Sequence, residues 1–411
     1  MNGGVSMGKE KTVSNVQMKI WNLGFTCVFI SYLAMSVGQK LVNPLISRYT
    51  NYLGGSATII GLVSSSFAIV ALACKIFSGP VIDTFKKKSV LIFALVVMCI
   101  SYAGYAISTS ATEMLVFRMI QGLGQAFTST CFTVAATQTL PKEKLSAGMG
   151  VFWTAQSIPQ LFGAALGVQL ADMVGYHFAF GLGAGLMLLA VIITCFMKID
   201  SGEPHEKKKV EIKLSNIITK DALLPASFIG ILYLGYCSIG SFLIVFCDEQ
   251  HIAGNAGLHT TAYAVALLVA RPFIGKMVDR FGFVKVTIIN VILCIVTFFM
   301  ISAASNIWII ILAGAVVAFG FGATQPTIQA LAMKCCKSDK RGAASSTNYI
   351  GQDLGSLFGP LIAGVVADTF GYVNMWRIMT IPFFIVLVLL FLSRRKIGKL
   401  ESDFVAEKVE K

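Results

Sequence analysis

The chain has 411 residues, of which 56% are hydrophobic and only 13% are charged, and its mean hydropathy is +0.76. A soluble globular domain carries about 25% charged residues, so this composition excludes a protein whose whole surface faces water. The formal net charge of +13 is interpreted as a membrane-orientation signal that meets anionic lipid headgroups, and no nucleic-acid partner is expected.

Apolar stretches long enough to cross a bilayer, about 20 residues each, follow one another along nearly the whole chain. Short polar turns join most of them, for example Ser108-Thr109-Ser110. The pattern predicts an all-α membrane protein with no folded soluble domain. The predicted spans are 20–47, 57–82, 89–108, 112–139, 145–172, 176–197, 222–247, 257–279, 284–304, 307–334, 341–366 and 376–393.

The basic residues predict how these spans are oriented. With the N-terminus in the cytoplasm, twelve spans place nearly all loop Lys and Arg residues on that side, and only Arg48 and Arg377 fall on opposite loops. This is a strong positive-inside asymmetry. We therefore predict a multi-pass plasma-membrane protein with both termini cytoplasmic. No signal peptide is expected, because residues 1–19 contain no apolar core.

A constant offset of 196 residues aligns the two halves of the chain. Matches of Asp, Gln and Tyr at one register are informative, because chance matches in membrane helices are mostly Gly and Leu. The matched pairs include Lys75 with Arg271, Gly79 with Gly275, Asp83 with Asp279, Gln156 with Gln352, Asp172 with Asp368, and Tyr176 with Tyr372. The predicted domains are a tail (1–19), a six-span bundle (20–197), a polar linker (198–221), a second six-span bundle (222–393) and a tail (394–411).

The loop after the second span carries Gly79-x3-Asp83-Thr84-Phe85-Lys86, and its counterpart carries Gly275-x3-Asp279-Arg280-Phe281-Gly282. These loops resemble the signature of the major facilitator superfamily, and the resemblance extends over all twelve spans. Arg118-x2-Gln121-Gly122 resembles the fourth-span motif of that family. The Gly-Pro patterns that begin at Pro159 and end at Pro360 resemble its bacterial drug and metabolite efflux members. One departure is that the first loop has Asp83-Thr84-Phe85-Lys86-Lys87 where the family has Asp-Arg-x-Gly-Arg, so the positive charge is kept and the glycine is not.

The resemblance implies the fold of that superfamily: two pseudo-symmetric bundles that rock about a central site. It also implies a gate at the two loops, in which the aspartates contact the opposite bundle near Leu145 and Arg341 in one conformation. Helix N-termini favour such anionic partners. The alternative is that the aspartates only orient their own loops. The predicted gating residues are Gly79, Asp83, Lys86, Gly275, Asp279 and Arg280.

Ionisable residues inside spans are costly and indicate functional sites. Lys75 and Arg271 lie one turn from the loop glycines, which favours a structural role. Lys40 and Arg118 are predicted at a similar depth, around 10 Å. They could bind an anionic group, or repel each other until an acidic partner arrives, or serve as a snorkelling lysine and a structural arginine.

Asp353 is the acidic residue near the middle of a span. Because protonation would neutralise it, we predict that it couples transport to protons; a helix-to-helix hydrogen bond is the alternative. Several amides could complete a polar, substrate-binding cavity with Lys40 and Arg118, or could instead hold helices together. They are Asn43, Gln121, Gln156, Gln325, Asn348 and Gln352.

We therefore expect a secondary transporter that moves a small organic molecule by alternating access, with efflux coupled to protons as the first hypothesis. Symport or exchange of an organic anion is the second, and a non-transporting receptor on the same fold is a third. The sequence contains no GxxxxGK[ST] loop, no metal-ligand spacing among its ten cysteines and no nucleophile–base set. We expect no cofactor, no metal, no catalytic residue and no enzymatic activity, and a monomer in contact with membrane lipids.

Overall fold

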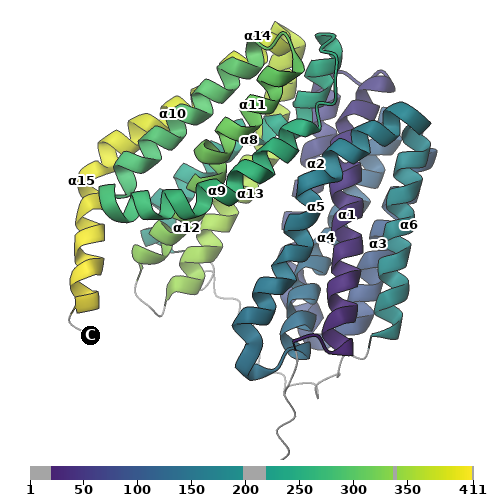
Figure 1. The fold of residues 1–411 in the computed structure, drawn as a ribbon, viewed down its shortest axis with the longest axis horizontal. Helices are drawn as coiled ribbons and strands as arrows, with labels where there is room; N and C mark the ends of the chain where they lie inside the picture. Colours follow the sequence, from purple (N-terminus) through teal and green to yellow (C-terminus); the bar gives the residue numbers. More distant parts are fainter. Residues whose placement is uncertain (1–19, 198–218, 337–339, 410–411) are drawn as a thin grey trace, which may run out of the picture.

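The computed structural model describes residues 20–197, 219–336 and 340–409, and their regular structure is helical. The helices form two bundles that lie side by side (Figure 1). The first bundle contains α1 (Leu23–Tyr52), α2 (Ala57–Thr84), α3 (Lys87–Ile107), α4 (Ala111–Thr139), the short η1 (Lys142–Lys144), α5 (Leu145–Val174) and α6 (Tyr176–Phe196).

The second bundle repeats this arrangement. It contains η2 (Lys220–Ala222), α8 (Leu223–Glu249), α9 (Leu258–Phe281), α10 (Phe283–Ser302), α11 (Ile307–Val317), η3 (Ala318–Gly322), α12 (Ala323–Lys334), α13 (Arg341–Phe370), α14 (Tyr372–Ile378) and α15 (Ile381–Val409). The segments α11, η3 and α12 follow one another without a break and form one crossing, and η3 is a π-helical turn within it. The last crossing is divided into α14 and α15. The described residues therefore form twelve crossings in two bundles of six.

The predicted repeat is visible in the backbone. Gly175 ends α5 with φ +97° and Gly371 ends α13 with φ +79°, and these residues are 196 positions apart. Each glycine adopts a left-handed conformation that lets one helix stop and the next begin at once. The two halves thus share a sharp turn that other residue types would strain.

Most predicted boundaries lie within about four residues of the observed ones, and two lie further away. Helix α1 continues to Tyr52, beyond the predicted end at 47, and so includes Arg48. Helix α15 continues to Val409, through most of the segment predicted as a tail. Ten described helices satisfy length and hydropathy limits for crossing a membrane, and α4 and α5 are not among them. These two helices are rich in polar residues because both contribute side chains to a central cavity.

Local signals explain where helices begin. Ser110 Oγ accepts a hydrogen bond from the Glu113 backbone N–H (3.3 Å), and the Glu113 carboxylate accepts one from the Thr109 N–H (2.7 Å). This is a capping arrangement that satisfies free backbone donors at the start of α4. Asn306 caps α11 in the same way, through bonds from Trp308 and Ile309. Polar turn residues therefore start the apolar helices.

The most apolar crossings lie at the periphery. Helices α3 and α6 form the outer side of the first bundle, and α10 and α15 form that of the second (Figure 1). The substantial contacts between bundles instead run through α2 with α13, α5 with α9 and α1 with α8. Each bundle has its own large apolar core.

The bundles meet at one end and separate towards the other (Figure 1). We call the end where the bundles meet the closed end; it contains the α1–α2 turn, the α5–α6 turn and the end of α13. The opposite end is the open end. Near the closed end Ile60 of α2 is fully buried within the apolar core of the second bundle. Backbones touch here: a Cβ on Gly61 would lie 2.3 Å from the Pro360 carbonyl oxygen, and one on Gly364 would lie 2.4 Å from the Ala57 oxygen.

This contact predicts the effect of a small substitution. Gly61→Ala should shift the conformational equilibrium about tenfold or more away from the closed-end contact, because the added methyl overpacks a backbone crossing and such strain costs about 1–3 kcal/mol. Distances between spin labels on Tyr52 and Phe370 would measure the shift. Gly185→Ala, with no atom within 4 Å of its Cβ position, is the matched control. Equal distance distributions for the two variants would contradict the prediction.

Candidate functional site

A cavity of about 660 Å³ lies between the bundles and receives side chains from both. Helices α1, α2, α4 and α5 form one wall, and α8, α9 and α13 form the other. Several of the residues predicted to bind substrate or protons line it: Lys40, Asn43, Arg118, Gln156, Gln352 and Asp353. The cations come from the first bundle and the acidic residue from the second. Among the described side chains that line the cavity, Asp353 is the acidic one.

Arg118 is held in place by a network of neutral polar side chains. Its Nη1 donates to Asn43 Oδ1 (3.1 Å) and to Gln121 Oε1 (2.7 Å). Gln121 is almost fully buried; its Nε2 donates to Asn43 (3.2 Å) and Tyr102 (3.0 Å), and its Oε1 accepts from Tyr105 (2.8 Å). Gln121 therefore positions Arg118 from behind and is not among the lining residues. The network orients a cation without neutralising its charge.

The two cations of this wall, Lys40 and Arg118, have different surroundings. The Arg118 guanidinium lies over the Phe67 ring, 4.6 Å from its centroid, a favourable cation–π contact. Lys40 packs through its stem against Gly163 of α5 and makes no hydrogen bond with any described residue. Measured along the helices, Lys40 lies about 18 Å from the end of α1 and Arg118 about 10 Å from the start of α4. The distances from the helix ends therefore differ, because α1 extends further than the hydropathy indicated, and the similar membrane depth of the two cations stays a prediction.

Amides fill much of the remaining polar surface. Gln39 donates to Gln125 (2.6 Å), and Gln325 donates to the cavity residue Gln352 (3.3 Å). Asn348 is buried and hydrogen-bonds Gln329. The structure therefore places Gln325 and Asn348 beside the cavity residues and not among those that line it.

Several lining residues were not predicted from the sequence. Gln125, Ser129 and Gln160 lie on α4 and α5, on helix faces shared with predicted residues. Helical spacing could have indicated the two amides, since Gln125 lies about two turns from Arg118 and Gln160 about one turn from Gln156.

The predicted gate loops lie at the open end, where the bundles are apart. The side chains of Gly79, Asp83 and Asp279 lie outside those that the structure describes. Lys86 precedes α3 and is exposed, and Arg280 lies over Phe281, 5.2 Å from the ring centroid. No atom lies within 4 Å of the Cβ position of Gly275. In this conformation Gly275 makes no close helix contact, so its predicted gating role remains an expectation about the other conformation.

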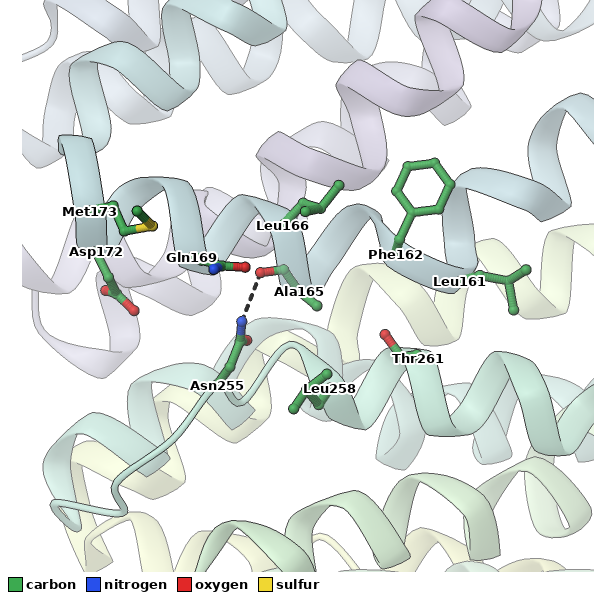
Figure 2. A pocket seen from close by; sticks show the side chains of 10 residues that line it. All are labelled: Leu161, Phe162, Ala165, Leu166, Gln169, Asp172, Met173, Asn255, Leu258 and Thr261. Carbon is green, nitrogen blue, oxygen red and sulfur yellow. Dashed lines mark hydrogen bonds between the residues drawn. The ribbon is translucent and has the colours of Figure 1, made fainter.

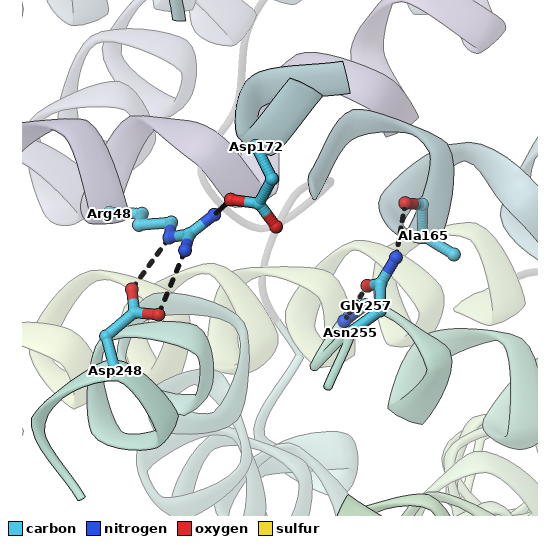
Figure 3. A network of polar contacts seen from close by, with 6 residues as sticks. All are labelled: Arg48, Ala165, Asp172, Asp248, Asn255 and Gly257. Atoms are coloured by element: carbon cyan, nitrogen blue, oxygen red, sulfur yellow. Dashed lines mark hydrogen bonds and ion pairs between the residues drawn. The ribbon is translucent and has the colours of Figure 1, made fainter. Parts of the chain in front are cut away.

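The closed end is held by polar contacts that were not predicted from the sequence. Arg48 of α1 binds two aspartates: Nη1 donates to Asp172 of its own bundle (2.6 Å), while Nε and Nη2 donate to Asp248 of the other bundle (2.7 and 3.0 Å) (Figure 3). Both ion pairs found among the described side chains involve Arg48. The bidentate pair with Asp248 has a favourable fork geometry. Because Arg48 was predicted to lie in a loop, its ion pairs with the two aspartates were not predicted.

Two further contacts cross the closed end. Asp368 of α13 accepts hydrogen bonds from the backbone N–H groups of Ala57 and Thr58, 2.8 Å each, at the start of α2. Asn255, which precedes α9, donates a hydrogen bond from its side-chain amide to the Ala165 oxygen (2.8 Å). Its Oδ1 accepts one from the Gly257 backbone N–H (2.9 Å) (Figure 3). The repeat could have indicated Asp368, because Asp172 is its equivalent. The equivalence did not show that the two carboxylates bind different partners.

A second, more apolar groove lies between α5 and the start of α9, at the closed end (Figure 2). It shares no lining residue with the central cavity. Within the described part of the chain, no group of three or more His, Cys, Asp or Glu residues could hold a metal ion.

Comparison with known proteins gives consistent matches. The chain matches the family described as Major Facilitator Superfamily over residues 25–253 and 238–408. It is 23% identical to the multi-drug resistance efflux pump PmrA homolog of Lactococcus lactis, covering 89% of this chain and 92% of that protein. It is 24% identical to the multidrug resistance protein MdtG of Salmonella typhi, covering 86% and 90%. The nucleoside transporter NupG has a similar structure, with a TM-score of 0.76, 16% identity, and coverage of 90% and 99%; this likeness shows the fold.

Proposed function

This chain belongs to the major facilitator superfamily, and from that premise we propose that it exports drug-like molecules or metabolites in exchange for protons. The function that is already established is less specific. The chain is a multi-pass membrane transporter and not an enzyme, since its relatives and structural neighbours are transporters. Export, proton coupling and the substrate class belong to the proposal. The names of the PmrA homolog and MdtG support the efflux branch.

The observation that carries the proposal is the central cavity, built from both bundles and shut off at the closed end. A molecule held by both walls would be transferred when the bundles rock from one contact to the other. We propose that the open end faces the cytoplasm. Exposed basic residues near the open-end loops, such as Lys144, Lys220 and Arg280, fit the positive-inside rule in that orientation. The cavity would then load from inside the cell, as export requires.

Asp353 supplies the proposed proton coupling. It lies half-buried in the cavity wall, near the middle of α13. A carboxyl group that is neutral in one conformation and charged in the other links proton movement to the rocking of the bundles, because the two charge states favour different environments. Proton release towards the cytoplasm would accompany substrate export.

Inside-out vesicles with an acid interior test this proposal. A fluorescent lipophilic cation should accumulate inside them, and the interior pH should rise as protons leave. A protonophore should abolish both signals, and vesicles without the protein are the control. No substrate movement with any tested cation, neutral drug or carboxylate would favour a non-transporting receptor on this fold and contradict the proposal.

Lys40 and Arg118 favour a second candidate, transport of an organic anion. Two cations on one cavity wall, with no ion pair to any described acidic residue, suit a carboxylate or phosphate group. In the same vesicles an anion symporter would behave differently, because an acid interior would drive a preloaded carboxylate out together with protons. The direction of movement thus separates the two candidates.

Lys40→Ala gives a prediction that addresses this candidate directly. If Lys40 binds the anion, affinity for aromatic carboxylates should fall about tenfold or more (1.4 kcal/mol per factor of ten), while protein stability should stay level or rise, because a poorly solvated ammonium is removed. Arg118→Ala should instead destabilise the protein by about 1–3 kcal/mol, since the amide oxygens of Asn43 and Gln121 each lose one of their two donors. Ligand titrations followed by thermal unfolding measure both effects. Unchanged carboxylate affinity in Lys40→Ala would exclude the role of Lys40.

A further inference from the structure

The groove between α5 and α9 has the shape of a site for a membrane amphiphile. Its volume is about 540 Å³, and its α5 wall consists of residues that lie three or four positions apart, on one face of the helix (Figure 2). From Leu161 to Asp172 this face extends about 16 Å. Leu161, Phe162 and Leu166 form its deep part, and Gln169 and Asp172 lie near the closed end. Along the α5 wall the residues change from apolar to polar towards the closed end, with Thr261 of α9 facing the apolar part and Met173 beside Asp172.

Several apolar side chains of the groove are exposed at the surface of the helices. Phe162 and Leu166 have 36% and 43% of their surface exposed, and Met173 has 74%. Leu258 of α9 forms the opposite wall. An acyl chain could lie along these side chains without entering the protein core.

The polar end of the groove offers one acceptor and one donor. Asp172 uses one oxygen to bind Arg48, and its other oxygen accepts no hydrogen bond from the described residues; its side chain is 52% exposed. The Gln169 amide is exposed and likewise makes no hydrogen bond there. Residues three apart on a helix are about 5–6 Å from each other. A headgroup with an ammonium and a phosphate separated by two carbons could reach both side chains.

We propose that this groove binds a phospholipid whose headgroup carries a primary ammonium beside its phosphate, as in phosphatidylethanolamine. The ammonium donates to the free Asp172 oxygen, the phosphate accepts from the Gln169 amide, and one acyl chain follows the apolar face of α5. The network of Arg48 with Asp172 and Asp248 has a net negative charge, which disfavours an anionic lipid. A quaternary ammonium cannot donate a hydrogen bond, which disfavours phosphatidylcholine.

The groove has one wall from each bundle. Asn255 binds the Ala165 oxygen across it (2.8 Å), so the groove exists while α5 and α9 are in contact. A lipid bound there favours the conformation with the closed end shut, since a ligand stabilises the state that binds it better. This consequence rests on the proposed alternating access, whereas lipid binding itself does not.

Lipid retention tests the site. The full chain is purified from vesicles of phosphatidylethanolamine with phosphatidylglycerol, or of phosphatidylcholine with phosphatidylglycerol, and bound lipids are counted by native mass spectrometry. The wild type should retain phosphatidylethanolamine in preference to the other two lipids. Asp172→Asn should lose that preference about tenfold, and Leu166→Trp, which fills the groove, should release the lipid without a change in thermal unfolding.

Asp248→Asn is the matched control, because it breaks the same Arg48 network but does not line the groove. It should retain phosphatidylethanolamine as the wild type does. Equal loss in Asp172→Asn and Asp248→Asn would overturn the proposal, since the lipid would then depend on closure alone. Retention of phosphatidylcholine at the wild-type level of phosphatidylethanolamine would also overturn it. Because the count requires no transport, its outcome is independent of the proposed export activity.

Discussion

Replacing Asp353 by asparagine is expected to abolish proton-driven accumulation of substrate while leaving substrate exchange intact. Asparagine resembles the protonated carboxyl group in shape and charge but cannot release a proton. The bundles can therefore still rock with substrate bound, but a pH gradient no longer drives them in one direction. Accumulation in inside-out vesicles should fall about tenfold or more, to the level without a gradient, whereas affinity should change by less than that factor.

Two companion variants make the result specific. Asp353→Glu keeps a titratable group and should retain part of the accumulation. Gln352→Ala alters a neighbouring cavity residue that cannot titrate; it should change affinity but not the dependence on the gradient. Accumulation by Asp353→Asn that still follows the pH gradient would assign proton coupling to another group.

Much of the architecture could be predicted because lipid restricts what a chain can do. Apolar stretches identify helices, and the 196-residue repeat groups them into two bundles. The end of α1 could not be predicted in this way. Arg48 interrupts the apolar stretch, so hydropathy ends the span before it, yet Asp172 and Asp248 bind the arginine within the fold. The second of these partners lies in the other bundle, and such distant pairing leaves no local signal.

The cavity was partly predictable for a related reason. Lys40, Arg118 and Asp353 stand out because a charge inside a span needs a polar environment. Amides carry less information, because the same side chain can line a cavity or join two helices. Gln156 lines the cavity, whereas Asn348 is buried beside it. The rotation of each helix about its own axis decides which of these positions an amide takes. The sequence of a weakly amphipathic helix does not indicate that rotation. Substrate binding and coupling by these residues remain predictions.

Replacing Asp368 by alanine should shift the protein away from the closed-end contact. Its carboxylate accepts two hydrogen bonds from the first turn of α2, in the opposite bundle, where backbone donors are free and the helix dipole favours an anion. Such bonds contribute about 1.5–3 kcal/mol when buried. Because Asp368 is exposed, we expect roughly 1–2 kcal/mol in total, or a 5- to 30-fold change in the ratio of conformations.

Spin-label distances at both ends distinguish this shift from local unfolding. Labels on Tyr52 and Phe370 report on the closed end, and labels on Phe85 and Phe281 report on the open end. In Asp368→Ala the first distance should increase while the second decreases, as expected for rigid rocking. Thr369→Ala is a suitable control, because that hydroxyl bonds only its own helix, at Val365. An increase at the closed end without a decrease at the open end would indicate local fraying and contradict the prediction.

The Arg48 network provides the final step of this test. Arg48→Ala removes a second, separate contact across the same end, so it should shift the same equilibrium in the same direction. Contacts without shared partners contribute additively within about 0.5 kcal/mol. The double variant should therefore show the product of the two single shifts, and high salt should reproduce part of the Arg48 effect in the wild type. A double variant no more open than Asp368→Ala would mean that α2 and α13 alone hold the closed end, with Arg48 only following their movement.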